Sequence, residues 1–207
     1  MDQKNLSTHP KQRRRSTAHK KSRQMSLEKL HELLILSTDG SDRLEQLLHP
    51  FYRRHLSDEQ LFTILQDEWV WLHNISDNLE ELGEVFPLYG PVRAMMTPVE
   101  NAAYDALPNT LTVHRGCDAG WLEGLCWSLN KKVANWFAFY PLTQAEEPTL
   151  MTARVEKKFV MAIKLGRGEE EIITFGADVQ TVEPADPGLY KEYCEERAAK
   201  RNEKIAG

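Results

Sequence analysis

The segment Gly166–Gly176, GRGEEEIITFG, sets three glutamates side by side directly before an isoleucine pair. We predict from it a strand that begins near Glu169 and runs on through the isoleucines. Successive side chains of a strand point to opposite faces. Glu169 and Glu171 would therefore share one face, and Glu170 would point away from it.

Two carboxylates on one face, two strand steps apart, form a paired-acid arrangement. One of them can hold a substrate hydroxyl or stabilise a developing cation while the other positions a nucleophile. The same cluster is also typical of a solvated loop edge beside a glycine-rich turn. The spacing permits the chemistry without proving it.

The character of the chain changes at Pro108. Residues 26–107 carry apolar residues at helical spacing. The part from 108 to 183 has the texture of short strands, with one short helix over 131–140. Helices followed by strands favour an α+β fold. The expected strands cover 110–116, 124–130, 149–157 and 159–166, with one or two more between 170 and 183.

Two stretches of the helical half have the form of helix starts. Ser57 and Gln60 match a capping box, and Thr97 is followed by a proline and, at the third helical position, a glutamate. Behind Ser57, apolar residues continue at helical spacing as far as Leu82. We therefore predict one long helix there, ended by Gly83.

The two ends of the chain differ from the middle. Residues 1–25 hold eight Lys/Arg and one Asp, with few large apolar side chains. Such a segment cannot bury enough surface to offset its ordering entropy, so we predict a disordered basic arm, which can grip phosphates or serve as a solvated tail. Residues 26–183 are predicted to form a single domain, and residues 184–207 a C-terminal helical tail.

The overall composition indicates a soluble cytoplasmic protein. No apolar run approaches the roughly 20 residues that cross a bilayer, and we identify no signal peptide. Cys117, Cys126 and Cys194 are odd in number and contain no C-x-x-C pair. We therefore expect neither a disulfide framework nor a metal site, and a reducing compartment.

Three pieces of the strand-rich half carry the candidate chemistry. The first, Thr112–Gly116, contains Arg115 beside a glycine that leaves room for close backbone approach. The second, Trp127–Ala138, places the hydroxyl of Ser128 ahead of a helix, and the third is the glutamate triplet. This order resembles the Arg–Ser–Glu class of mono-ADP-ribosyltransferases. The likeness covers roughly residues 108–183.

The resemblance implies a split β-sandwich that clamps NAD+ across a cleft, with residues 26–107 as the family's N-terminal helical layer. By the motif, Glu171 would bond the ribose 2′-hydroxyl and stabilise the oxocarbenium-like ribose as nicotinamide leaves. Glu169 would orient or deprotonate the acceptor. Glu170 would be largely dispensable.

The resemblance also gives roles to the other two motifs. Arg115 would hold the pyrophosphate or its adjoining ribose, for which a planar, permanently charged fork is suited. Ser128 would bond Glu171 or the nicotinamide-side ribose. The family often carries Ser-Thr-Ser where this chain has Trp127–Leu129, which leaves the central serine without hydroxyl neighbours.

The resemblance places three further residues at the nicotinamide end of NAD+. Gly116 and His114 would contribute backbone contacts to the nicotinamide amide. Phe137 would form a wall of the nicotinamide pocket, although core packing explains an aromatic residue there equally well. The family needs no metal.

The acceptor of the ADP-ribose stays open. By the resemblance, a glutamate and not a glutamine at position 169 suggests a protein arginine, yet the same carboxylate could activate an exocyclic amino group of an RNA or DNA base. Removing the net +7 of residues 1–25 from the net −5 of the whole chain leaves a body of −12. The arm favours nucleic acid slightly over protein. The resemblance further implies a toxin or effector, as in a toxin–antitoxin or anti-phage system, with a neutralising partner protein.

Other classes of protein compete with this interpretation. The variant serine motif also fits a catalytically inactive module that binds nucleic acid or a partner. A hydrolase with a carboxylate pair would make Arg115 and Ser128 incidental. Cys117 or Cys126 as a nucleophile is the weakest alternative, because neither has an identifiable histidine partner.

Overall fold

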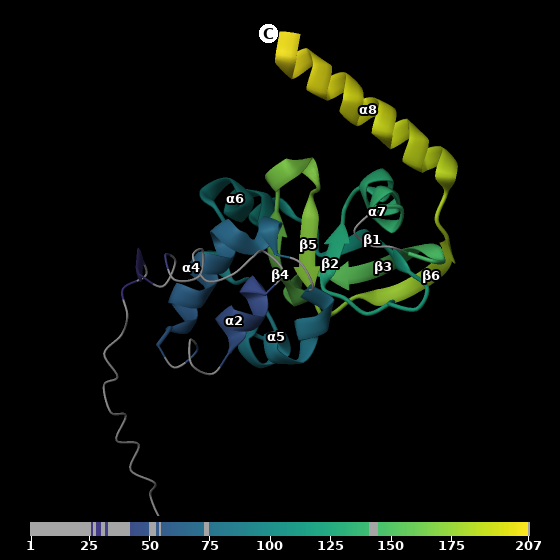
Figure 1. The fold of residues 1–207 in the computed structure, drawn as a ribbon. Coiled ribbons are helices and arrows are strands. Elements are labelled where there is room, and N and C mark those ends of the chain that lie inside the picture. Colours follow the sequence, from purple (N-terminus) through teal and green to yellow (C-terminus); the bar gives the residue numbers. More distant parts are fainter. Residues whose placement is uncertain are drawn as a thin grey trace, which may run out of the picture.

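The structure is a computed structural model that describes residues 42–49, 53, 55–72, 75–140 and 145–206, with positions 26, 28, 29 and 32. Helices of the first half lie on one side of a six-stranded antiparallel sheet (Figure 1). The α+β class is therefore confirmed. The predicted arm, residues 1–25, and most of the helix expected after it lie outside the described residues.

Both predicted helix starts are confirmed as capping boxes. The Gln60 amide donates to Ser57 Oγ over 3.2 Å, and the Ser57 amide donates to Gln60 Oε1 over 2.9 Å. Thr97 and Glu100 exchange the same two bonds. Each box satisfies backbone donors that a helix start leaves without intrahelical partners. The described helices of this half are α2 (Arg43–Leu48), α4 (Asp58–Glu68), α5 (Leu79–Val85) and α6 (Pro98–Ala106), with 3₁₀ turns at Trp69–Trp71 (η1), Ile75–Asn78 (η2) and Arg93–Met95 (η3).

The prediction of one long helix behind Ser57 is wrong. After α4 the chain tightens into η1, becomes extended at Leu72, and resumes as α5, with Gly83 inside that helix. Tryptophan and valine have lower helix propensity than the leucines before them. The break turns Trp69 into the core at 1% exposure and leaves Trp71 60% exposed.

The six strands follow the predicted strand-rich half closely. The strands are β1 (Thr110–Asp118), β2 (Cys126–Ser128), β3 (Pro148–Glu156), β4 (Val160–Lys164), β5 (Glu171–Thr174) and β6 (Asp178–Pro184). All pair antiparallel, and their spatial order is β4-β5-β2-β1-β3-β6.

The short strand β2 joins two parts of this sheet. Its register with β1 is a single pair, His114 opposite Ser128, whereas β1 pairs with β3 along its whole length. On its other side β2 pairs with β5 over all three of its residues. The sheet is therefore narrowest at β2, and the residues of this strand determine how the two parts meet.

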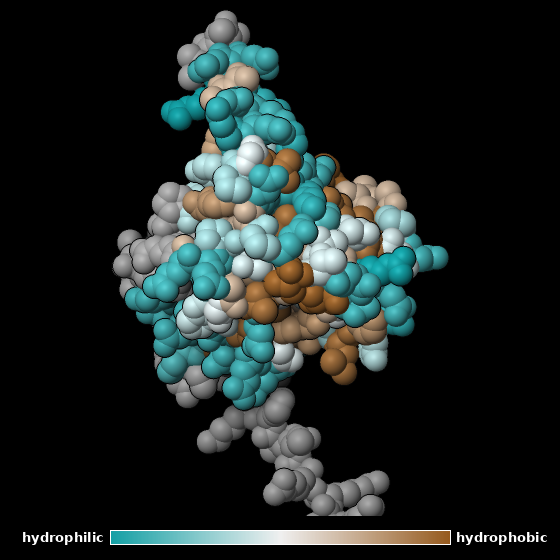
Figure 2. Space-filling model, turned by 90° about the vertical axis from the view of Figure 1, so that its right-hand side faces the viewer, coloured by the Kyte–Doolittle hydropathy of each residue, from teal (hydrophilic) through white to brown (hydrophobic). Residues whose placement is uncertain are grey.

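Two helices complete the strand-rich half. The first, α7 (Lys131–Ala138), packs on β1, and the second, α8 (Pro187–Ala206), contacts α7 and then projects from the body (Figure 1). The projecting part is mainly hydrophilic (Figure 2). In the described part of the chain, α8 included, no helix combines the length and the apolar character needed to cross a membrane.

A buried ion pair fastens the helical layer to the sheet. Lys164 of β4 is 3% exposed, and its Nζ donates to Glu100 Oε2 over 3.1 Å. The same ammonium donates to the carbonyls of Gln66 and Met95, over 3.1 Å and 3.0 Å. Glu100 in turn accepts from the amide of Leu165 over 2.9 Å. One lysine thus connects α4, η3, α6 and β4, and each of its bonds offsets part of the cost of burying its charge.

We expect Lys164→Met to destabilise the protein by about 3–5 kcal/mol, because it leaves the Glu100 charge buried without its cation. Adding Glu100→Gln should recover part of this loss by removing the unpaired charge. Urea denaturation of the single and double variants measures both effects. Lys158→Met is the control: Lys158 pairs with Glu156 at the surface, so its loss should cost under about 1 kcal/mol. Equal losses for both lysines would contradict the proposed role of the buried pair.

The same pair predicts a component of acid sensitivity. Burial raises the pKa of Glu100, but the amides of Thr97 and Leu165 and the ammonium of Lys164 outweigh it and lower the pKa overall. A carboxyl with a lowered folded pKa contributes stability above its unfolded pKa, about 4.3, and loses it as the pH falls through the folded value. The melting temperature, measured from about pH 6 down to pH 3, should therefore fall less steeply for Glu100→Gln than for the unchanged protein. Parallel curves would exclude this contribution.

Candidate functional site

Three of the predicted site residues lie in a row across adjacent strands. Ser128 of β2 is opposite His114 of β1 on one side and opposite Glu171 of β5 on the other. Directly opposed residues of antiparallel strands project on the same face. Sheet pairing therefore brings together the motifs of β1, β2 and β5, which are far apart in the sequence.

The predicted strand start at Glu169 is wrong. β5 begins at Glu171, Glu169 has a right-handed helical backbone, and Glu170 has a positive φ of 47°. The alternation of strand faces therefore does not apply to this triplet, because a turn and not a strand carries its first two residues. Glu169 is nevertheless buried and Glu170 exposed, so the turn separates the two side chains.

The Ser128 hydroxyl holds that turn in place. It donates to the carbonyl oxygen of Glu169 over 2.8 Å and accepts from the amide of Asn130 over 3.0 Å. Asn130 then caps α7, since its Oδ1 accepts from the amide of Lys132 over 3.0 Å. The serine bonds the backbone of the glutamate triplet, whereas the resemblance implied a bond to Glu171 or to the nicotinamide-side ribose.

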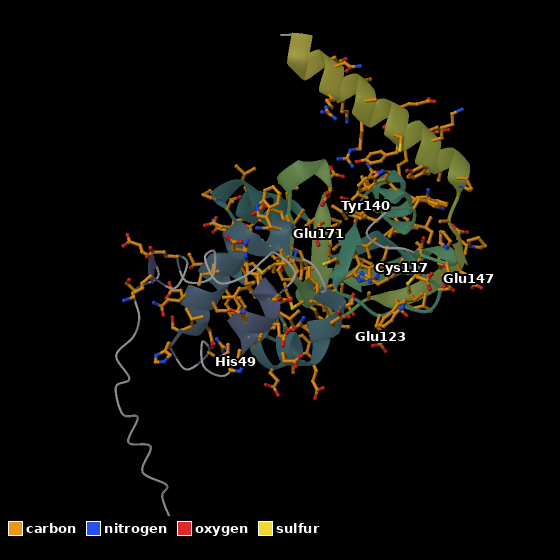
Figure 3. The ribbon with its side chains drawn as sticks, in the orientation of Figure 1. His49, Cys117, Glu123, Tyr140, Glu147 and Glu171 are labelled. Carbon is orange, nitrogen blue, oxygen red and sulfur yellow. The ribbon has the colours of Figure 1, made fainter. Side chains whose placement is uncertain are left out.

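The carboxylate of Glu171 has donors from two other elements. The indole Nε1 of Trp69 donates to Glu171 Oε1 over 3.2 Å. Burial, together with the Glu171 carboxylate that accepts its hydrogen bond, raises the pKa of the Cys126 thiol well above its usual value. Figure 3 shows Glu171 near the middle of the molecule, beside β5 and between the first-half helices and α7. The partly buried acid is therefore held from the helical layer as well as from the sheet.

Arg115 reaches the same neighbourhood from β1. Its Nη1 donates to the carbonyl of Cys126 over 3.2 Å, and its Nη2 donates to the carbonyl of Glu123 over 3.0 Å. Cys126 thus lies between Arg115 and Glu171, so the two charged groups are not on opposite sides of the molecule. The Nε of Arg115 is buried without a hydrogen-bond partner among the described residues. The guanidinium orders the loop before β2 and keeps further N–H groups for other acceptors.

Gly116 and His114 have structural partners on the face of the row. A Cβ on Gly116 would lie 1.9 Å from the carbonyl oxygen of Ala134, so the backbone that approaches this glycine closely is that of α7. His114 Nδ1 lies 2.9 Å from Thr152 Oγ1. Burial and Lys131 lower the pKa of His114 against the opposing effect of Glu183. The imidazole is therefore neutral at pH 7.

Phe137 belongs to an aromatic group on α7. Its ring lies 5.0 Å from that of Trp136 and 6.1 Å from that of Tyr140. From α8, Tyr193 stacks edge-on against Trp136 at 6.1 Å, and Arg197 lies over the same indole at 4.4 Å. Phe137 is partly exposed, so it is not sealed into the core.

The α8 helix also comes close to the glutamate triplet. Burial and the negative charge of Glu169 raise the pKa of Tyr193, against the lowering effect of Arg197. Tyr193 is therefore within electrostatic reach of the buried acid. The predicted C-terminal tail thus contacts the body through α7, where Tyr193 and Arg197 meet the indole of Trp136.

Cys117 and Cys126 show no sign of nucleophilic activation. Burial raises the pKa of both Cys117 and Cys126, which keeps them as thiols, whereas the thiolate is the nucleophile. Cys117, Cys126 and Cys194 are all free. In the part of the chain that the structure describes, no group of three or more His, Cys, Asp and Glu side chains is placed to hold a metal ion.

A surface pocket of about 340 Å³ lies near the start of β1, the end of β3 and the start of β6. Its lining includes Arg154, Asp178 and Phe159, and none of the predicted site residues. The strand pairing, and not this pocket, defines the candidate site, because it brings His114, Ser128 and Glu171 into one row. Arg115, the strand neighbour of His114, reaches this row through the carbonyl of Cys126.

Known proteins give no independent assignment. A scan against protein-family models, a search of curated proteins and a search of solved structures each returned no match.

Sequence reasoning missed the contribution of the helical layer to this site. Trp69 stands 102 residues before the glutamate that it contacts, and its helical spacing marks it only as a packing residue. Nothing in the sequence indicated that the Ser128 hydroxyl bonds both the turn before β5 and Asn130, the residue that caps α7. The Trp-Val-Trp run at residues 69–71 was the one available signal, because these residue types have a lower helix propensity than the leucines before them.

We expect Gly124→Ala to disturb the Arg115 contacts. The added Cβ would lie 2.3–2.4 Å from three guanidinium atoms of Arg115, so the loop or the guanidinium must move. The expected cost is about 1–3 kcal/mol in urea denaturation. Gly83→Ala in α5 is the matched control, because its nearest neighbour would be 3.9 Å away. That change should stabilise the protein by about 0.5–1 kcal/mol. If Gly124→Ala left the stability unchanged, the Arg115 contacts would not require a residue without a side chain at position 124.

Proposed function

We propose that the protein is a mono-ADP-ribosyltransferase that moves ADP-ribose from NAD+ to a macromolecular acceptor. The observation that carries this proposal is the position of Ser128, opposite both His114 and Glu171. It gathers the Arg, Ser and Glu motifs of the resemblance on three adjacent strands. Arg115 joins them through its bond to the Cys126 carbonyl.

The reaction breaks the glycosidic bond between nicotinamide and ribose. Nicotinamide departs with the bonding electron pair as a neutral molecule, and the ribose develops oxocarbenium character. The Glu171 carboxylate binds the 2′-hydroxyl and stabilises that charge as it forms. Glu169 orients the acceptor and takes its proton as the new bond to the ribose carbon forms. Glu170, exposed on the turn, takes no part.

The remaining residues bind NAD+ or shape its site. Arg115 offers its further N–H groups to the pyrophosphate or the adjoining ribose. Gly116 and His114 contribute backbone contacts at the nicotinamide end, and Phe137 forms a wall beside it. Ser128 acts chiefly by fixing the turn that carries Glu169, which follows from its bond to the Glu169 carbonyl. No metal takes part.

The finer fold assignment, a split β-sandwich with a helical layer, belongs to this proposal. The single residue pair between β1 and β2 supports it, since a sheet joined so narrowly can divide there into two parts. Packing gives a reason for the first of the two departures from Ser-Thr-Ser: the side chain of Trp127 is 4% exposed and packs in the core. A hydroxyl at that position would be buried among apolar groups at a cost.

The acceptor we favour is a base of RNA or DNA, with a protein arginine as the close second. The basic arm would raise the local concentration of nucleic acid through phosphate contacts. Such an enzyme would act in the cytoplasm as a toxin or effector, in a toxin–antitoxin or anti-phage system, and a partner protein would neutralise it.

Glu171→Gln should reduce nicotinamide release from NAD+ by about 10²- to 10³-fold, because it removes the charge that stabilises the transition state. Glu170→Gln is the matched control and should retain nearly full activity. Both are followed by chromatography of released nicotinamide. Equal loss from the two changes would remove the assignment of roles within the triplet.

A complete lack of turnover in the unchanged protein would favour the inactive binding module on the same fold. That module would show no NAD+ affinity in titration calorimetry. It would instead bind RNA or DNA in a salt-dependent way and lose this binding when residues 1–23 are deleted.

Labelling of a cell lysate tests the acceptor class. The protein is incubated with lysate and NAD+ labelled in its adenylate phosphate, and aliquots are then digested with protease or nuclease. We expect nuclease to remove the macromolecular label and protease to leave it. Removal by protease alone would make a protein the acceptor, and Glu171→Gln protein reports the enzyme-independent background.

A further inference from the structure

Trp69 is a buried tryptophan whose polar atom contacts the candidate catalytic acid. We propose that Trp69 is a positioning residue for Glu171: its indole N–H holds the carboxylate in the orientation that catalysis requires. This inference rests on the proposed function and adds to it a residue outside the three motifs. The contact, Nε1 to Oε1 over 3.2 Å, has the length of a hydrogen bond.

The indole itself is rigidly held. Trp69 is 1% exposed, and its ring lies edge-on to that of Phe86 at 6.3 Å. Its own amide donates to the carbonyl of Leu65, so it closes α4 at the point where η1 begins. A buried tryptophan usually finds a partner for its N–H. Here that partner is the acid of the row and not a backbone carbonyl.

Ser128, the other candidate for orienting the Glu171 carboxylate, donates its hydrogen bond to a different group. The Ser128 hydroxyl donates its single proton to the Glu169 carbonyl. Trp69 therefore donates the hydrogen bond to Glu171 that was one of the two roles implied by the resemblance for the serine. Because an indole N–H can only donate, it favours the ionised acceptor over the protonated one.

Other titratable groups also act around Glu171, and the test must separate their effects from that of Trp69. The Cys126 thiol donates to Glu171 and stays protonated, and Glu169 and Arg115 both act on that thiol. Lys164 is opposite Glu171 on β4, but its ammonium is bound to Glu100. Trp69 differs from all of these in being uncharged at every pH, so its removal changes one hydrogen bond without adding or removing a titrating group.

The principal test is the pH profile of nicotinamide release by Trp69→Phe. We expect kcat at neutral pH to fall about tenfold while KM for NAD+ changes less than about twofold, since the lost bond orients the acid and does not touch NAD+. The acid limb of the profile should move up by roughly one pH unit, because the ionised carboxylate has lost a donor.

Phe86→Leu is the matched control for packing. It loosens the same aromatic contact and lowers stability but keeps the indole N–H, so its acid limb should stay in place. If Trp69→Phe fails to fold, benzothienyl-alanine at position 69 preserves the shape of the indole and replaces its N–H by sulfur. An unshifted acid limb in a folded variant, or the same shift in Phe86→Leu, would overturn the positioning role.

The indole resonance of Trp69 gives a readout that needs no activity. In ¹H–¹⁵N spectra, its Nε1–H signal should shift as Glu171 titrates, and Glu171→Gln should abolish that titration. Lack of any titration would refute the contact. If the contact titrates but the unchanged protein releases no nicotinamide, the proposed function fails and the hydrogen bond stands.

Discussion

The site depends on the pairing of one short strand. β2 is three residues long, yet it lies between β1 and β5, and Ser128 at its end pairs with both. The same residue fixes the turn before β5 and, through Asn130, the start of α7. A change in the register of β2 by one residue would turn Ser128 to the opposite face and separate it from His114 and Glu171. Register at this strand is therefore the constraint from which the geometry of the site follows.

The helical layer supports the strands through buried polar contacts as well as apolar packing. Lys164 and Glu100 join four elements, and Trp69 joins the end of α4 to the candidate acid. Buried polar groups are costly unless their partners are present, so these contacts require one arrangement of helices and sheet. Apolar packing alone would tolerate small shifts of the layer, whereas the two polar connections would break. The position of Glu171 is thus tied to the core of the first half.

Local patterns predicted the elements of this fold well where they rest on adjacent residues. The capping boxes at Ser57 and Thr97 formed as expected, and the strands after Pro108 have nearly the expected bounds. Errors arose where tertiary contacts compete with periodicity. The helix after Ser57 breaks at Trp69, which enters the core, and the glutamate triplet begins as a turn held by the Ser128 hydroxyl. Neither influence can be read from neighbouring residues.

The α+β class and the helix starts could be predicted from the residues alone, because each depends on residue type and short-range spacing. The grouping of Arg115, Ser128 and Glu171 as one candidate set rests instead on the order of their motifs along the chain and on the resemblance that this order carries. Which side chains touch follows only from the folded arrangement. It assigned the serine to the Glu169 backbone, the guanidinium to the Glu123 and Cys126 carbonyls, and the indole of Trp69 to Glu171. The physical reason is that a hydrogen-bond donor takes the acceptor that folding brings within about 3 Å, and strand register and helix packing set that neighbour.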